Sequence, residues 1–223
     1  MISFEQIKHS GEITTYIKKG NDLLGAIGFT EHGFAHAGRV SEKAANILEL
    51  LEYPERTVEL GKIAAYMHDI GNCVNRNDHA QSGAVMAFKI LHDMGFDPEE
   101  IADIVGAIGN HDEGTGSPVS PISAALILAD KSDVRRTRVR YKSRTAEKIS
   151  ADIHDRVNYA VEQSDIVILP KEKKAVLSLQ IDTSISPVME YFEIFLSRMV
   201  LCRTAAEFLN LTFELNINHI KLL

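Results

Sequence analysis

A histidine and an aspartate stand side by side at His68-Asp69, directly after an apolar run with helical spacing that ends at Met67. Adjacent residues cannot share one face of a helix, but at a helix end the backbone can turn both side chains toward one point. An imidazole and a carboxylate together suit Fe(II), Mn(II), Zn(II) or Ni(II), and the two oxygens of Asp69 could bridge two ions. A lone pair of this kind is more often a helix-end pair that interacts with the helix dipole or with solvent.

Four further residues of metal-binding type fall where consecutive helices are expected to begin or end. They are His36, His79, His111 and Asp130. Taken singly, each is best interpreted as a capping or solvated residue. Together with His68-Asp69 the set exceeds what chance placement usually gives, so the sequence predicts a metal centre built from several helices.

Basic residues close to these positions are candidates for substrate binding. Seven of them lie within fourteen residues: Lys131, Arg135, Arg136, Arg138, Arg140, Lys142 and Arg144. This segment is either a solvated connection between helices or a site for a polyphosphate or nucleotide, because guanidinium groups bind phosphate through paired hydrogen bonds. Lys131 and Arg135 are the better candidates, since they are nearest to Asp130.

Three residues beside the proposed ligands are expected to support them. His32 lies one helical turn before His36, so it would face the same side and meet either a ligand or the substrate. Asp112 and Glu113 follow His111, and they could orient a ligand histidine or take part in proton transfer.

The elements that must position these residues are mainly helices. Apolar residues recur at helical spacing in several segments, and capping signals such as Asp97-Pro98 mark helix starts. The predicted helices cover residues 34–51, 58–67, 79–94, 98–111, 122–133 and 146–162. A loop is expected at 114–121, where glycine, serine and proline gather.

After residue 163 the pattern changes. Two short runs rich in β-branched residues, 166–169 and 175–181, predict a β-hairpin. A helix is expected at 187–209, and apolar residues that alternate with polar ones predict a half-buried strand at 212–220. The fold class is therefore mainly α: a helical domain at 1–163, followed by a small α/β appendage at 164–223 in the order strand, strand, helix, strand.

Composition limits the classes of function. The formal net charge of −7 over 223 residues gives no support to binding of a nucleic acid polymer, although an acidic protein can hold a local basic pocket. Cys73 and Cys202 are expected to be reduced thiols. No signal peptide and no run of eighteen apolar residues is found, so we expect a cytoplasmic protein without a membrane span.

The order of the candidate ligands resembles the HD superfamily of metal-dependent phosphohydrolases, whose pattern is His, His-Asp, one or two further histidines, and Asp. The resemblance covers about residues 30–135. Its motifs here are His36 followed by Arg39-Val40, Ala64-Ala65-Tyr66-Met67-His68-Asp69-Ile70-Gly71, His79-Ala80-Gln81-Ser82-Gly83, Ile108-Gly109-Asn110-His111 and Leu128-Ala129-Asp130-Lys131. The two extra histidines resemble the dinuclear branch, which includes HD-GYP-like proteins and a diadenosine-tetraphosphate hydrolase group.

The resemblance implies how two divalent metal ions would be shared. The first ion would be held by His36, His68, Asp69 and Asp130, and the second by Asp69, His79 and His111, with Asp69 bridging. Iron or manganese is expected first, with zinc, nickel, cobalt or magnesium as alternatives. Two ions about 3.5–4 Å apart would place a bridging hydroxide in line with phosphorus. We assign catalytic roles to Asp69, His111 and Lys131.

This chain departs from the family pattern in ways that bear on the substrate. Many dinuclear relatives place a lysine directly after the His-Asp-Ile-Gly turn, but here that position is Asn72, which we also expect to contact substrate. The role of the lysine could pass to Lys131, Arg135 or Arg39. The HD-GYP type has two consecutive histidines where this chain has His111-Asp112, and the Gly-Tyr-Pro segment is absent. Cyclic-di-GMP is therefore not the expected substrate.

The resulting hypothesis is hydrolysis of a phosphate ester or anhydride in a small, nucleotide-like molecule at a dinuclear site. Two alternatives stay open: an HD-type diiron oxygenase, and a regulatory HD protein with an idle metal site. The C-terminal appendage could join two subunits through a strand edge or its helix, which would give a homodimer.

Overall fold

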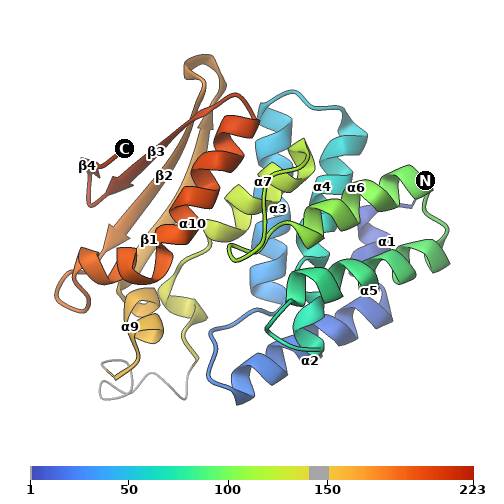
Figure 1. Cartoon of the computed structure of the whole chain (residues 1–223), viewed down its shortest axis with the longest axis horizontal. Coiled ribbons are helices and arrows are strands. Elements are labelled where there is room, and N and C mark those ends of the chain that lie inside the picture. The colour runs from blue at the N-terminus through green and yellow to red at the C-terminus, as the bar shows by residue number, and fades with distance from the viewer. Residues whose placement is uncertain (1, 141–150) are drawn as a thin grey trace.

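Helices make up most of the first 160 residues (Figure 1). The computed structural model describes residues 2–140 and 151–223. The helices of this part are α1 (Phe4–Lys8), α2 (Gly11–Ala26), α3 (Phe34–Leu50), α4 (Glu55–Met67), α5 (His79–Met94), α6 (Pro98–Gly109), α7 (Pro121–Lys131) and α9 (Ile153–Ala160), with short 3-10 turns η1 (Ile70–Cys73) and η2 (Arg136–Arg138).

Helix α7 lies at the centre of the molecule. Every residue from Ile122 to Lys131 is buried, and the helix packs against α3, α4, α6 and α10 (Val188–Phe208). A helix that is apolar on all sides has to be enclosed, because it has no polar face to turn to water. This enclosure brings Asp130, in the last turn of α7, to the ends of the surrounding helices.

The C-terminal segment forms a four-stranded sheet with one helix on it. The strands are β1 (Val161–Leu169), β2 (Lys174–Ile181), β3 (Thr212–Ile217) and β4 (Ile220–Lys221), and they lie in the order β1-β2-β3-β4. β2 and β3 are parallel, and α10 is the crossover between them. Such a connection needs a helix, since parallel strands cannot be joined by a tight turn. α10 lies between the sheet and the helical body (Figure 1).

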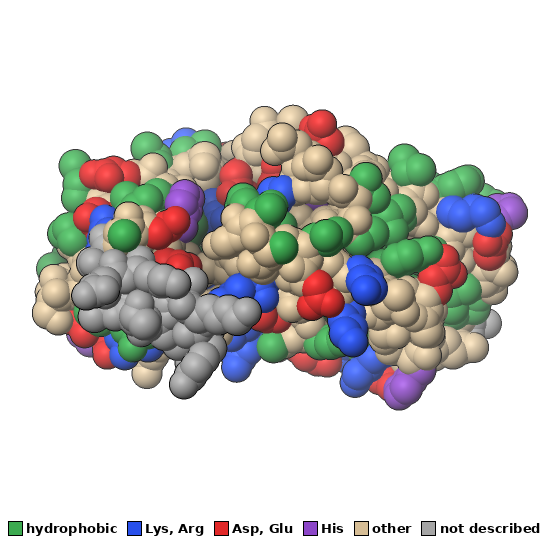
Figure 2. Space-filling view, turned by 90° about the horizontal axis from the view of Figure 1, so that it is seen from below, with side chains coloured by type: hydrophobic (Ala, Val, Ile, Leu, Met, Phe, Trp, Pro, Cys, Tyr) green, Lys and Arg blue, Asp and Glu red, His purple; other side chains and the backbone are tan. Residues whose placement is uncertain are grey.

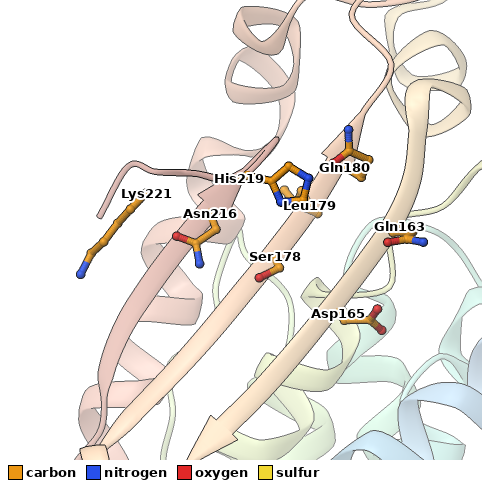
Figure 3. Close-up of a pocket in the computed structure, with 8 residues that line it drawn as sticks. All are labelled: Gln163, Asp165, Ser178, Leu179, Gln180, Asn216, His219 and Lys221. Atoms are coloured by element: carbon orange, nitrogen blue, oxygen red, sulfur yellow. The ribbon is translucent and has the colours of Figure 1, made fainter.

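The molecular surface carries both signs of charge. On the face that Figure 2 shows, lysine, arginine, aspartate and glutamate side chains of the described residues are interspersed with hydrophobic ones. Figure 3 shows the open face of the sheet, where Asp165, Ser178 and Asn216 lie at a shallow cavity of about 340 Å³. Its lining is polar and includes none of the candidate metal ligands.

The predicted fold class, mainly α with a C-terminal α/β appendage, is confirmed, including the hairpin and the order strand, strand, helix, strand. One hydrophobic core runs through both parts, from Phe4 to Ile217. The division into domains at residues 1–163 and 164–223 therefore stays a prediction. None of the helices in the described residues has the length and apolar character needed to cross a membrane.

Two element boundaries differ from the sequence prediction. The helix expected at 146–162 is described only from residue 151 onward, where Asp152 caps α9 by accepting hydrogen bonds from two backbone N–H groups, and the chain enters β1 at Val161. Residues 146–150, like Lys142 and Arg144, lie outside the described residues. The single strand expected at 212–220 is wrong: Asn218 and His219 adopt positive φ and form a tight turn of the kind that asparagine favours.

Candidate metal centre

The backbone at His68-Asp69 turns both side chains toward one point. His68 is the C-cap of α4 and keeps helical angles, whereas Asp69 has left the helix with φ −98° and ψ 4° before η1 begins. The side chains of His68 and Asp69 are therefore no longer separated by about 100° around a helix axis, as two consecutive helical residues would be. The apolar last turn of α4, Ile63 to Met67, is buried and fixes this end of the helix in the core.

The other four predicted ligands lie at the ends of four other helices. His36 lies in the first turn of α3, His79 is the first residue of α5, His111 follows the end of α6, and Asp130 is in the last turn of α7. The structure thus brings together all six predicted ligands. We call them the His-Asp cluster: His36, His68, Asp69, His79, His111 and Asp130. All six are buried.

One side of the cluster gathers around a shared pair of carboxylates. His36 Nε2 lies 3.2 Å from Asp130 Oδ1 and 3.7 Å from Asp69 Oδ2. His68 Nε2 lies 3.3 Å from Asp69 Oδ2 and 3.7 Å from Asp130 Oδ1. The ligand atoms of His36, His68 and Asp130 all lie within 4.8 Å of one another, a separation that one metal ion can span.

The other side of the cluster uses the second oxygen of Asp69. His79 Nε2 lies 3.4 Å from Asp69 Oδ1 and 3.1 Å from His111 Nε2. A second compact group of possible ligand atoms consists of His68, Asp69 and His111. The two oxygens of Asp69 therefore face different histidines.

The Nδ1 atom of each histidine is held by an acceptor outside the cluster. His68, His79 and His111 each donate from Nδ1 to a backbone carbonyl oxygen three residues earlier, at 2.7, 3.0 and 2.6 Å. His36 Nδ1 donates instead to Asp133 Oδ2 at 2.7 Å. These bonds fix each ring and leave Nε2 directed at the centre, which is how histidines that bind metals are usually oriented.

Two observations show that the donor set fits cations. His36 Nε2 and Asp69 Oδ2 are buried, and neither has a hydrogen-bond partner among the described residues. The Nε2 atoms of His79 and His111 face each other at 3.1 Å although each ring already donates through Nδ1, so two lone pairs meet. Buried polar groups without partners cost free energy, and divalent ions bound by imidazole nitrogen and carboxylate oxygen would satisfy them.

Burial and neighbouring charges shift the pKa values of several residues of the His-Asp cluster. Burial lowers the pKa of His111 well below its usual value, and nearby positive charges lower it further. Burial alone would raise the pKa of Asp69, but the neighbouring His68 lowers it well below its usual range. Burial would lower the pKa of His68, but Asp69 and Asp130 raise it.

A model of the HD domain family matches residues 33–160, which is more than half of the chain. The chain belongs to the HD domain family. This match covers the whole His-Asp cluster. HD-family membership and the two groups of possible ligand atoms together support a metal-dependent hydrolase.

Two relatives can be compared with this HD-domain chain. The uncharacterized protein MJ1020 of Methanocaldococcus jannaschii is 28% identical over an alignment of 163 positions that covers 63% of this chain and 62% of that protein. This chain therefore spans less than two thirds of the length of that relative. A crystal structure of a predicted HD superfamily hydrolase from an uncultured Thermotogales bacterium is 29% identical, with 57% of this chain and 69% of that chain covered and a TM-score of 0.45.

Lys131 lies beside the HD-domain cluster inside an ion-pair network. Its Nζ lies 2.8 Å from Asp130 Oδ2 and 2.6 Å from Glu113 Oε2, and Glu113 also pairs with Arg198 at 2.9 Å. Burial would lower the pKa of Lys131, but the two carboxylates raise it. Lys131 is therefore held between two carboxylates and orients Asp130, and the catalytic role predicted for it stays a prediction.

Asn72, predicted to contact substrate, and His32 and Asp112, predicted to support the ligands, lie at different distances from the cluster. Asn72 donates from Nδ2 to Asp69 Oδ1 at 2.7 Å, so it orients the carboxylate. The His32 ring packs edge-on against His36, with 5.5 Å between ring centroids. Asp112 Oδ1 lies 4.0 Å from His79 Nε2 at the outer edge. All three residues border the cluster; the substrate contact of Asn72 and the supporting roles of His32 and Asp112 stay predictions.

The structure does not bring two of the predicted substrate-binding residues to the cluster. Arg39 is exposed on α3, and no hydrogen bond or ion pair among the described residues joins it to the cluster. Arg135 donates to Asp133 Oδ1 at 2.9 Å and lies 3.6 Å from Glu31. Their role in substrate binding stays a prediction.

Sequence reasoning missed Asp133, Arg76 and Arg198. Asp133 holds His36, and it follows Asp130 by three residues, which is a spacing that could have drawn attention to it. Arg76 precedes His79 by three residues, and its Nη1 lies 3.4 Å from His79 Nε2. Arg198 meets Glu113 across 85 residues of sequence, and no local signal marks such a contact.

Replacing Asp133 with asparagine is expected to lower metal affinity about 10- to 100-fold, which is the usual effect of removing a carboxylate that orients a ligand histidine. Asparagine keeps the size of the side chain but removes the charge that His36 and Arg135 share. Titration of metal against a competing chelator measures the effect. Asp22→Asn, at an exposed site on α2, is the matched control, and equal affinities of the two variants would contradict the prediction.

Proposed function

We propose that this HD-domain protein is a phosphohydrolase that cleaves a phosphate ester or anhydride bond in a small phosphorylated molecule, such as a nucleotide. The observation that carries the proposal is the position of Asp69. One of its oxygens lies near His36 and His68, and the other lies 3.4 Å from His79. One carboxylate between two groups of histidines supports two divalent ions, with iron or manganese as our first expectation.

The residues around the predicted ligands would keep the bound ions in an arrangement that suits phosphate chemistry. Two divalent ions bound there would acidify a water molecule and offset negative charge on the phosphoryl oxygens. Asn72 keeps Asp69 in one orientation, and Lys131 keeps Asp130 ionised through its 2.8 Å ion pair. The buried Nδ1 bonds of His68 and His111 hold their rings without rotation.

The pocket beside the cluster supports a small substrate. It measures about 290 Å³ and includes His32, Arg76, Glu113, Arg138 and Arg198 in its lining. Sites for small molecules usually measure about 300–1,000 Å³, so the volume of this pocket is just below that range. Three arginines and three carboxylates (Glu113, Asp152 and Asp155) line the pocket, so an anionic group would bind at the arginines, and the size of the pocket favours a single small molecule over a nucleic acid polymer.

The direct test is hydrolysis of a broad panel by the protein loaded with Mn(II) or with Fe(II) under anaerobic conditions. The panel would contain phosphate monoesters, phosphate diesters, nucleoside triphosphates and dinucleoside polyphosphates. We expect turnover that depends on metal and stops on addition of a chelator. Absence of turnover with all substrates, in a protein shown to hold metal, would contradict the proposal. Oxygen consumption by the iron form would then favour the diiron oxygenase, and no reaction of either kind would favour an idle site.

A further inference from the structure

The pocket beside the His-Asp cluster is shared between the HD domain and the C-terminal segment. The HD-domain side is formed by the connection after α2, by Arg76 and by Glu113. α9, at the end of the HD-domain match, also lines the pocket, and α10 of the C-terminal segment contributes Ile194, Phe195 and Arg198. α10 also packs against α7, the helix that carries Asp130. The C-terminal segment is thus a wall of the pocket.

Arg198 is held in place but keeps hydrogen-bonding capacity. Its Nε donates to Glu113 Oε1 at 2.9 Å, and its guanidinium lies over the Phe195 ring at 4.3 Å from the centroid. Among the described residues, the two terminal nitrogens have no hydrogen-bond partner. A guanidinium fixed on one edge and on one face presents its remaining N–H groups without further loss of side-chain freedom.

On the HD-domain side of the pocket, the guanidinium group of Arg76 also packs on an aromatic ring and keeps unused N–H groups. Its guanidinium lies over the Phe29 ring at 5.7 Å from the centroid. Among the partners that the described residues supply, Nη1 alone is engaged, at 3.4 Å from both Asn72 Oδ1 and His79 Nε2, and these are long contacts. Arg76 therefore keeps N–H groups to donate directly beside a predicted metal ligand.

Two other cations near the cluster are engaged by protein groups. Lys131 lies between Asp130 and Glu113. Arg138 is buried and donates from Nε to the Glu31 carbonyl oxygen and from Nη1 to the Asp133 carbonyl oxygen. Its Nη2 has no hydrogen-bond partner among the described residues, but two backbone carbonyl groups hold this side chain in the protein core. Arg76 and Arg198 line the same pocket from two different segments of the chain, and each keeps guanidinium nitrogens without a hydrogen-bond partner among the described residues.

We propose that Arg76 and Arg198 form a clamp for a phosphate group of the substrate, and that the C-terminal segment is thereby part of the substrate-binding site. The inference rests on the proposed phosphohydrolase function. Paired arginines bind the oxygens of one phosphate group through parallel, charge-assisted hydrogen bonds. The clamp takes the place of the lysine that Asn72 replaces, and it specifies a substrate whose phosphate lies at the end of the pocket that faces the cluster.

The test uses the full-length, metal-loaded protein and the variants Arg198→Met, Arg198→Lys and Arg76→Met. Arg203→Met, at an exposed position of the same helix, is the matched control. The measurements are kcat and KM for the best substrate of the wild-type protein, the inhibition constant of inorganic phosphate, and the metal content. Circular dichroism and thermal melting check that each variant is folded.

We expect Arg198→Met and Arg76→Met each to raise KM and the phosphate inhibition constant about 10- to 100-fold, the effect of losing one hydrogen bond to a charged group. Metal content should not change, and the KM of Arg198→Lys should lie between the values of wild type and Arg198→Met.

Wild-type values of KM and of the phosphate inhibition constant in folded Arg198→Met would overturn the clamp while leaving the phosphohydrolase intact. A fall in kcat and metal content alone would also overturn it, since Arg198 would then act through Glu113. A wild-type protein that neither hydrolyses nor binds phosphate would overturn both proposals.

Discussion

Asp69→Asn is expected to reduce hydrolysis about 10³-fold or more. An asparagine amide keeps one oxygen but replaces the other with a nitrogen that carries hydrogens, so it cannot serve histidines on both sides, as Asp69 does at 3.3 and 3.4 Å. Bound metal supplies several kcal/mol of charge stabilisation in the transition state, and about 4 kcal/mol corresponds to this loss of rate. Steady-state kinetics and metal analysis of the purified variant would measure both effects.

The matched control for this substitution is Asp103→Asn on α6. Asp103 is exposed and lies outside the cluster, so the same chemical change should leave both rate and metal content as in wild type. Activity of Asp69→Asn within tenfold of Asp103→Asn would show that Asp69 is not a shared ligand, and it would remove the main support for two ions.

A second large effect, a loss of both stability and activity, is expected from Gly71→Ala. A Cβ atom on Gly71 would overlap the carbonyl oxygen of His79 and would lie 2.5 Å from the Gly83 backbone nitrogen. Both contacts are with the backbone of the first turns of α5, which cannot rotate away as a side chain can. Overpacking of this kind costs about 1–3 kcal/mol, and a domain of this size loses about 2–4 °C in Tm per kcal/mol.

This substitution should also impair the site, because α5 begins with His79. A displacement of about 1 Å can cost about 10²-fold in rate, so we expect loss of activity beyond the loss of stability. Gly106→Ala is the control: its Cβ would meet no atom within 4 Å inside α6, and it should stabilise the protein by about 0.5–1 kcal/mol. Thermal melting and kinetics at a temperature where both variants are folded test the pair. A Gly71→Ala variant as stable and active as wild type would contradict the packing account.

The six cluster residues could be located from the sequence because local signals mark the ends of helices. Asp78 and Asp97-Pro98 precede helices, and Gly71 follows one, so the chemistry-bearing residues next to them could be placed without a structure. The order of the residues then suggested that they meet. The distances could not be predicted, since they depend on how α3, α4, α6 and α7 pack around each other.

The surroundings of the cluster depend on contacts that are distant in sequence. Lys131 carries the right charge for a phosphate ligand, but its burial between Asp130 and Glu113 becomes visible only in the fold. Glu113 is in turn held by Arg198, which comes from a segment that the sequence suggested as a regulatory or dimerisation appendage. Amino-acid type shows which residues could bind phosphate, whereas the partners that already engage them decide which residues have hydrogen bonds to spare.

The boundary errors have a similar origin. Residues 161 and 162 continue a helical pattern, yet Val161 pairs with Ile181 in the sheet, so a tertiary contact overrides local preference. At the C-terminus the alternation of Phe213, Leu215 and Ile217 predicts a strand, and β3 contains all three residues. The strand ends earlier than the pattern predicts, because Asn218 and His219 turn the chain back so that Ile220 pairs with Ile217.

The measurement that tests the central claim most directly is the number of metal ions per chain, determined by elemental analysis of the active protein and by anomalous diffraction from its crystals. Two ions should be found, with His36, His68 and Asp130 around one, His79 and His111 around the other, and Asp69 between them. Loss of the ions should stop phosphate release. A fully active enzyme with a single ion, or with ions bound elsewhere, would contradict the claim.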